Sequence, residues 1–160
     1  MGPIVIDSSA LITLARADAL FLLPLGSREI WTIPEVYQET VEAGLAKGYP
    51  DAIVIQKCFQ DEMVCSRPPR NREKLSGVSS TDSRVIFLAE ELSAVFLLVN
   101  DHALLRRAEE YGVPAQFTAE YVKQLCEHGA LSRRRMESLF RVFLECRRYS
   151  EEFLNALMMR

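Results

Sequence analysis

Acidic residues follow the two most apolar strands that the sequence predicts. Residues 4–6 are three consecutive apolar β-branched residues, typical of a short strand buried on both faces, and Asp7 comes directly after them. Residues 94–99 predict a second buried strand, which Asn100 and Asp101 follow. Parallel strands present their carboxyl ends at one edge of a sheet, where ligands bind in open α/β folds. We therefore expect Asp7 and Asp101 to lie near one another at that edge.

Two further carboxylates are candidates for the same edge. Glu39 lies in the second turn of a helix predicted to begin at Pro34, and Asp82 begins the helix that precedes residues 94–99. Several carboxylates close together repel one another, and without a counter-ion at least one of them would hold its proton. Mg²⁺ or Mn²⁺ removes this conflict, because these hard cations take oxygen ligands. Such a site can orient a phosphate and activate water, so the pattern indicates metal-dependent hydrolysis of a phosphodiester.

Helix capping is the alternative explanation of these acids. Asp7, Asp82 and Asp101 each precede or begin a predicted helix, where an acidic side chain is favourable. Glu39, like most glutamates near the start of a helix, is explained equally well as a solvated side chain. Capping does not explain why both apolar strands deliver an acid to one edge, and both interpretations stay open from the residues alone.

The composition is that of one folded domain. The 160 residues are 49 % hydrophobic and 26 % charged, and no apolar run approaches the roughly 18 residues that span a bilayer. The N-terminus lacks the basic start and apolar stretch of a signal peptide, so we expect a cytoplasmic protein without membrane contact. The four cysteines form no C-x-x-C pair and no zinc-type spacing with the two histidines, which indicates reduced structural thiols.

Basic residues are clustered although the net charge is −3, a value that argues against a phosphate-binding surface over the whole molecule. The chain has 15 arginines against 4 lysines, and the planar guanidinium group suits phosphate recognition. Two short clusters lie at residues 133–135 and 147–148, and a third lies in a polar loop at residues 67–77. A solvated surface is the alternative for each cluster. The candidate phosphate contacts in the loop are Arg67, Arg70, Arg72 and Lys74.

Strand and helix patterns alternate from residue 4 to about 118, which predicts an α/β fold with a parallel sheet covered on both faces. The helix from Pro34 is expected to bury Val36, Val41 and Leu45. Residues 51–59 fit a helix or a strand, because periodicity does not separate the two in so short a segment.

Beyond residue 118 the pattern is helical throughout. We therefore expect a catalytic core over residues 1–118 and a helical extension over residues 119–160. Apolar stripes at residues 139–144 and 153–158 either fold back on the core or mediate association, as a homodimer or with a partner helix.

Four short motifs resemble, in family order, those of PIN-domain ribonucleases. The first is a hydrophobic strand followed by D-x-S-x-L-I, at residues 4–12, and the second is V-Y-x-E at residues 36–39. The third is an acid before a V-I-x-L-A helix, at residues 82–89, and the fourth is N-D followed by a helix and a G-V turn, at residues 100–113. Each motif alone is weak, but four in the same order are a strong signal.

The resemblance implies a three-layer α/β/α PIN-like fold with a central, mostly parallel sheet and extra C-terminal helices. It also implies RNA cleavage dependent on Mg²⁺ or Mn²⁺. Ser9 would orient the first acid by a hydrogen bond, and Asn100 stands where many members carry a further acid, which would weaken a second metal site. The metal ligands implied by the resemblance are Asp7, Glu39, Asp82 and Asp101.

Many members that this chain resembles are toxins of toxin-antitoxin pairs, such as the VapC group, whose antitoxin covers the active site and whose active form is a dimer. The first functional hypothesis is therefore an endoribonuclease, with arginines of the 67–77 loop or of residues 133–135 holding the RNA. The alternative is a PIN-like RNA-binding or protein-binding module without turnover, for which Asn100 is the best support.

Overall fold

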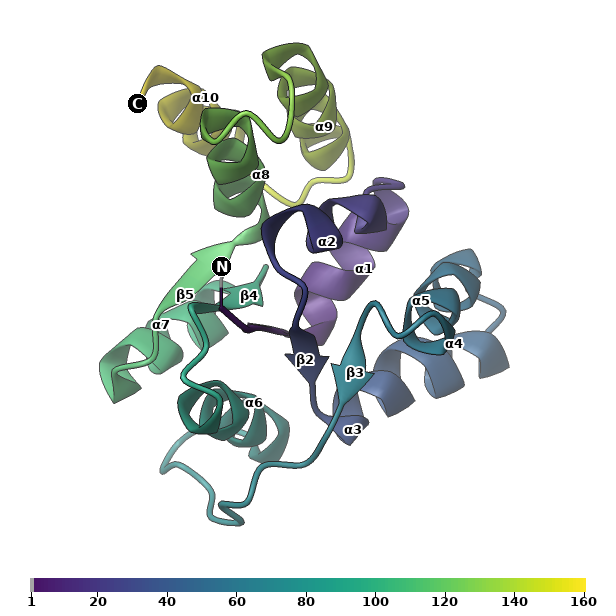
Figure 1. Ribbon diagram of the computed structural model, residues 1–160, viewed down its shortest axis with the longest axis vertical. Coiled ribbons are helices and arrows are strands. Elements are labelled where there is room, and N and C mark those ends of the chain that lie inside the picture. Colours follow the sequence, from purple (N-terminus) through teal and green to yellow (C-terminus); the bar gives the residue numbers. More distant parts are fainter. Residues whose placement is uncertain (1) are drawn as a thin grey trace.

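A five-stranded parallel sheet forms the centre of the computed structural model, which describes residues 2–160 (Figure 1). The strand order is β3-β2-β1-β4-β5, so the two most apolar strands, β1 and β4, are neighbours at its centre. The strands are β1 Ile4–Ile6, β2 Ile30–Thr32, β3 Cys65–Ser66, β4 Phe96–Val99 and β5 Ala115–Phe117.

Helices cover both faces of this sheet. Right-handed crossovers, the usual hand for parallel strands, place α1 and α3 to α5 on one face and α6 and α7 on the other, in keeping with the separation of the two groups in Figure 1. The sequence prediction of a three-layer α/β/α fold is therefore confirmed. The helical segments are α1 Ser8–Arg16, η1 Leu20–Leu22, α2 Leu23–Gly26, α3 Pro34–Tyr37, η2 Gln38–Glu42, α4 Ala43–Ala46, α5 Pro50–Gln60, α6 Ser80–Glu91, α7 His102–Tyr111, α8 Thr118–Glu127, α9 Arg133–Glu145 and α10 Glu151–Met159.

The segment from Pro34 is helical to Ala46, but it contains a π-helical turn at η2. In this turn the backbone N–H of Ala43 donates to the carbonyl of Gln38, five residues earlier, which rotates the following residues relative to an α-helix. Val36 and Val41 are buried as expected, whereas Leu45 is 40 % exposed. The prediction for Leu45 was wrong because the inserted turn shifts the helical register.

Residues 51–59, which fitted a helix or a strand, lie in α5. Pro50 takes the first helical position, where its missing N–H costs nothing. Ile55 is buried, but Ile53 is 62 % exposed. Because Ile53 is apolar but lies on the solvent side of the helix, the apolar residues do not follow a clear helical period in the sequence.

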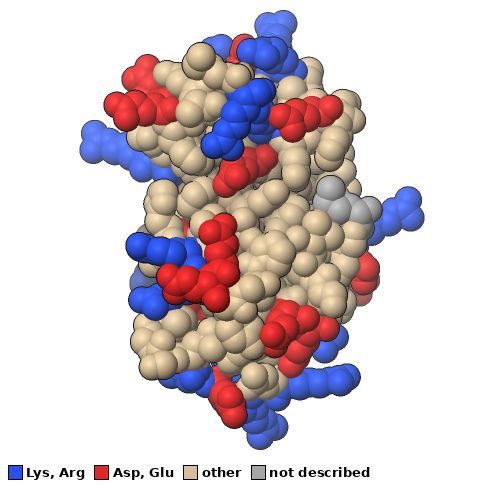
Figure 2. All heavy atoms as spheres, turned by 90° about the vertical axis from the view of Figure 1, so that its left-hand side faces the viewer, with Lys and Arg blue, Asp and Glu red and all other residues tan. Residues whose placement is uncertain are grey.

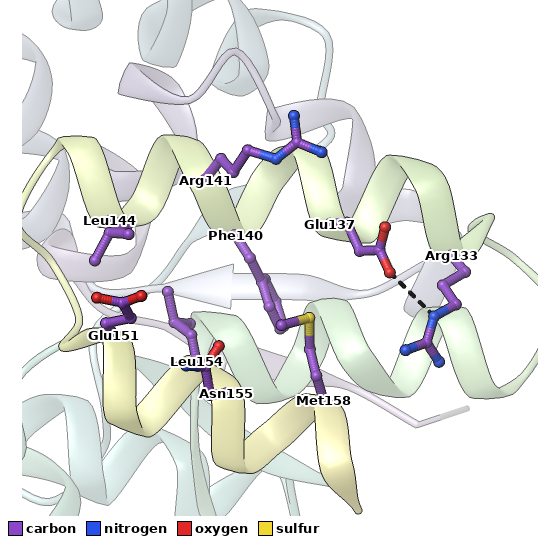
Figure 3. Close-up of a pocket in the computed structure, with 9 residues that line it drawn as sticks. All are labelled: Arg133, Glu137, Phe140, Arg141, Leu144, Glu151, Leu154, Asn155 and Met158. Atoms are coloured by element: carbon purple, nitrogen blue, oxygen red, sulfur yellow. Dashed lines mark hydrogen bonds and ion pairs between the residues drawn. The ribbon is translucent and has the colours of Figure 1, made fainter.

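The three C-terminal helices gather at one end of the molecule (Figure 1). The apolar stripe of α9 and that of α10 are largely buried within the chain, which is the fold-back arrangement. A hollow of about 340 Å³ remains between the two helices, and Figure 3 shows Phe140 of α9 facing Met158 of α10 across it. An ion pair of 3.1 Å between Arg133 and Glu137 lies at one end of this hollow.

The surface carries charges of both signs. Figure 2 shows acidic and basic side chains interspersed with other residues over one face, in keeping with the small net charge of −3. No single helix within residues 2–160 is long and apolar enough to cross a membrane. Residues 8–16 and 20–26 together reach the length and apolar character of a membrane span, but the two segments are bent by 117° relative to each other. The four cysteines are free thiols.

Tyr121 of α8 ties the C-terminal helices to the core. Its side chain is fully buried, and its hydroxyl lies 2.8 Å from the carbonyl oxygen of Leu22 and 3.0 Å from that of Leu23.

We expect Tyr121→Phe to lower the free energy of unfolding by about 1–3 kcal/mol, because it leaves buried carbonyl oxygens without a donor. Urea unfolding checks this value. Tyr49→Phe, at a tyrosine that is 49 % exposed, is the control. An equal loss of stability in both variants would contradict a stabilising role for the buried hydrogen bonds of the Tyr121 hydroxyl.

Candidate active site

Asp7 stands at the carboxyl end of β1 and caps the N-terminus of α1. Its backbone N–H donates to the carbonyl of Leu98 on β4 at 3.0 Å, which fixes its place between the two central strands. Its Oδ2 accepts a hydrogen bond of 2.9 Å from the Ser9 hydroxyl and one of 3.4 Å from the Ser9 N–H. Only 5 % of the residue is exposed, so the carboxyl group is held in place and shielded from water.

A chain of hydrogen bonds supports Ser9 from behind. The N–H of Asn100 donates to the Ser9 hydroxyl at 2.9 Å, so this hydroxyl must direct its own proton to Asp7. The Asn100 Nδ2 donates to the Thr13 hydroxyl at 2.8 Å, and that hydroxyl donates to the Ser9 carbonyl at 2.8 Å. Asn100 thereby links the end of β4 to the first turn of α1.

Asp101 is exposed and caps α7. Its Oδ1 accepts from the N–H of Ala103 at 2.8 Å and from that of Leu104 at 3.2 Å. Capping is therefore a real role of this residue. Because both bonds go to one oxygen, the cap occupies only one of the two oxygens of the carboxylate.

Asp82 and Glu39 come from the two helices that flank the same edge. Asp82 lies in the first turn of α6, where its N–H donates to the capping hydroxyl of Ser79 at 3.1 Å. Glu39 lies in η2 and is exposed. An ion pair between Glu35 of α3 and Arg84 of α6 joins these two helices, one helical turn from Glu39 and two residues from Asp82.

The pKa values indicate that these carboxylates share one region. Burial, outweighing the hydrogen bonds from Ser9 and the backbone, raises the pKa of Asp7 to about 6, and the charge of Asp82 adds to the rise. Burial also raises the pKa of Asp82, followed by the charge of Asp101 and, more weakly, that of Glu39, while Ser79 and Arg107 oppose the shift. Asp82 is thus the common neighbour of the other three acids. We call this region, with Asp7, Glu39, Asp82 and Asp101, the acidic edge.

The four carboxylates do not converge to metal-binding distance. Within residues 2–160, no group of three or more histidine, cysteine, aspartate or glutamate side chains is placed to hold one metal ion. The donor chemistry nevertheless suits a hard cation, because carboxylate oxygens are the ligands that Mg²⁺ prefers. Burial is the main cause that raises the pKa values of Asp7 and Asp82, and neighbouring carboxylates add to the rise. Like charges stay apart unless a cation lies between them.

The basic loop packs along α6, whose first turn carries Asp82. Arg70 and Arg72 line a hollow of about 580 Å³ together with Arg84, and the Glu91 carboxylate anchors the loop by accepting from the Arg70 N–H at 2.6 Å. Arg67 and Lys74 do not line this hollow. Arg135, of the cluster at residues 133–135, lies over the ring of Phe21, beyond the end of α1 that is remote from Asp7.

Sequence reasoning missed the ion pair between Glu35 and Arg84. The two residues are 49 positions apart, and nothing in their local sequence shows that they meet.

Burial of Asp7 predicts a pH-dependent cost to folding. A carboxyl group with a raised folded-state pKa favours folding while protonated, so the cost is absent below about pH 4 and complete above about pH 6. Asp7→Asn keeps an acceptor for Ser9 and removes the charge. We expect it to raise the free energy of unfolding at pH 8 by up to about 3 kcal/mol, with the gain disappearing as the pH falls toward 4.

Urea unfolding of both proteins from pH 4 to 8 checks this difference. Asp18→Asn is the matched control, because Asp18 is exposed, lies after the far end of α1 and has a left-handed φ of 53° that asparagine tolerates. An Asp7→Asn gain that is constant with pH would show that the buried charge is not its cause.

Comparison with known proteins agrees with the fold. The family model DUF3368, described as a PIN domain, matches residues 3–159. Among solved structures, a PilT N-terminus domain protein from the hyperthermophilic archaeon Sulfolobus solfataricus P2 is similar at a TM-score of 0.51 and 22 % identity, over 74 % of this chain and 89 % of that chain. No curated protein matches. Because the family model covers almost every residue, the chain belongs to the PIN-domain family.

Proposed function

We propose that this protein is a metal-dependent endoribonuclease that hydrolyses RNA phosphodiester bonds at the acidic edge. The PIN domain is a nuclease-type fold, and its family model matches residues 3–159. The observation that carries the proposal is the placement of the acids: Asp7 and Asp101 follow the paired central strands β1 and β4, and Asp82 lies in the first turn of α6. Burial is the main cause that raises the pKa values of Asp7 and Asp82, and the charges of neighbouring acids add to it. Carboxylates at the ligand-binding edge of an α/β sheet are suited to a divalent cation.

The four acids would hold Mg²⁺ or Mn²⁺, and a bound ion would polarise the phosphate and lower the pKa of a coordinated water. The chain's own part is to keep the ligands in place. Ser9 and Asn100 fix the carboxyl group of Asp7, and the N-terminus of α7 fixes that of Asp101. The ion pair between Glu35 and Arg84 holds together the helices that carry Glu39 and Asp82.

Phosphates outside the reacting bond would meet the arginines of the 67–77 loop. Arg70, Arg72 and Arg84 line one hollow along α6, the helix that carries Asp82, and the loop backbone is fixed to the last turn of this helix through Glu91. A planar guanidinium group binds phosphate oxygens in pairs, which suits it to hold a strand in register.

Metal binding and cleavage are tested together. We expect Mn²⁺ or Mg²⁺ to raise the thermal unfolding midpoint of the native chain, because an ion bound only by the folded state stabilises it. The same ions should support cleavage of RNA, and EDTA should abolish it. Asp7→Asn should lose at least a hundredfold in rate and most of the metal-induced stabilisation, whereas Asp18→Asn keeps both.

Equal cutting by Asp7→Asn and the native chain would indicate a contaminating nuclease. A metal-induced stabilisation that Asp7→Asn retains would place the ion elsewhere, and either result contradicts the proposal.

A binding module without turnover is the second candidate function. Two observations favour it: Asn100 stands where many family members carry an acid, and within residues 2–160 no three acids are placed to hold one ion. RNA that is bound but remains intact in Mn²⁺ would support this candidate over the nuclease.

A toxin role, an antitoxin partner and a homodimer are further parts of the proposal. Their support is the likeness of the four motifs to those of toxin members of the family. Light scattering of the purified 160-residue chain is expected to give twice the mass of 18.2 kDa. A monomer at all concentrations would contradict the dimer and leave the proposed chemistry unaffected.

A further inference from the structure

A second hollow adjoins the acidic edge on the side of β5. It has a volume of about 530 Å³, within the range of small-ligand sites, and we call it the His102 hollow. His102 follows Asp101 directly, and Phe117, whose ring centroid is 4.7 Å from that of His102, ends the strand paired with β4. The hollow therefore lies one strand away from the β4 end that carries Asp101.

Aromatic rings form part of this hollow. Tyr149 and Phe153 line it and stack on each other, with ring centroids 5.4 Å apart and an angle of 11° between the planes. The hydroxyl of Tyr149 accepts a hydrogen bond of 3.1 Å from the N–H of Ala119, which fixes the position of this ring pair. His102 is exposed and Phe153 is partly exposed, so both can meet a ligand.

Two arginines supply positive charge at the same place. Arg147 and Arg148 line the hollow, and within residues 2–160 neither takes part in a salt bridge. An unpaired guanidinium group next to aromatic rings is suited to a ligand that has both a flat ring and a phosphate. A nucleotide has both.

We propose that the His102 hollow binds an unpaired nucleotide of the RNA, with its base against His102 or Phe153 and a phosphate at Arg147 or Arg148. This inference rests on the proposed function, because the acidic edge sets where the RNA runs. A base that stacks on protein rings must leave its duplex, so the substrate is single-stranded at this position. The hollow at Arg70, Arg72 and Arg84 is lined by arginines and prolines without aromatic residues, so it suits backbone phosphates rather than bases.

The test measures binding rather than cleavage. The full chain is titrated in EDTA against a labelled single-stranded RNA, the same RNA in a duplex, and a single strand with abasic nucleotides. We expect the intact single strand to bind most tightly. His102→Ala should weaken its binding roughly fivefold or more, the lower end of the usual stacking contribution, and should leave the affinity for the abasic strand unchanged.

Arg147→Ala with Arg148→Ala should weaken binding of both single strands and make it less dependent on salt, because two phosphate contacts are lost. Arg28→Ala, at an exposed arginine before β2 and therefore at the opposite edge of the parallel sheet, is the matched control and should bind like the native chain. Unchanged urea unfolding midpoints show that the variants fold.

Equal binding of the abasic and intact strands, or a duplex that binds as tightly as the single strand, would overturn the inference. Tighter binding of an acidic peptide that competes at the same arginines would also overturn it. These outcomes are separate from those for the proposed function. Base-dependent binding without cleavage contradicts only the nuclease, and RNA cleavage by a chain whose RNA binding is unaffected by the loss of His102 and both arginines contradicts only the hollow.

Discussion

The pairing of β1 with β4 is the constraint on which the site depends. Their register places Ile6 opposite Leu98, and the N–H of Asp7 continues the pairing to the Leu98 carbonyl at 3.0 Å. Asp7 therefore cannot leave the sheet edge without breaking the central ladder. The hydrogen bond of 2.9 Å from the Asn100 N–H to the Ser9 hydroxyl then joins the turns after both strands, although these residues are 91 positions apart.

This arrangement places a charge where the fold disfavours one. Asp7 is 5 % exposed, and burial raises its pKa to about 6, so near neutral pH its negative charge costs folding energy. The N-terminus of α1 and the hydroxyl of Ser9 offset only part of this cost. A buried group that destabilises the native state is a common property of functional sites, where the same group would be stabilised by its ligand.

The sequence was a good guide where a single physical signal dominated. Continuous apolar residues predicted β1 and β4, and Asp7 and Asp101 followed from their ends. Prediction failed where the decisive contact was distant or the backbone departed from a standard period. The π-helical turn at η2 turned Leu45 to solvent, and no residue pattern announces such an insertion. The ion pair between Glu35 and Arg84 likewise exists only because α3 and α6 flank the same edge.

Capping and metal binding, which competed as explanations of the acids, are compatible in this geometry. The cap of α7 uses only Oδ1 of Asp101, and the helix N-terminus favours the charged form of the carboxylate. Asn100, which stands where many PIN-domain ribonucleases carry an acid, has a structural role of its own. Its Nδ2 donates to the Thr13 hydroxyl, whose proton is directed to the Ser9 carbonyl. A carboxylate at this position could not donate that bond and would add a further charge beside Asp7, so the amide keeps the support of Ser9 intact.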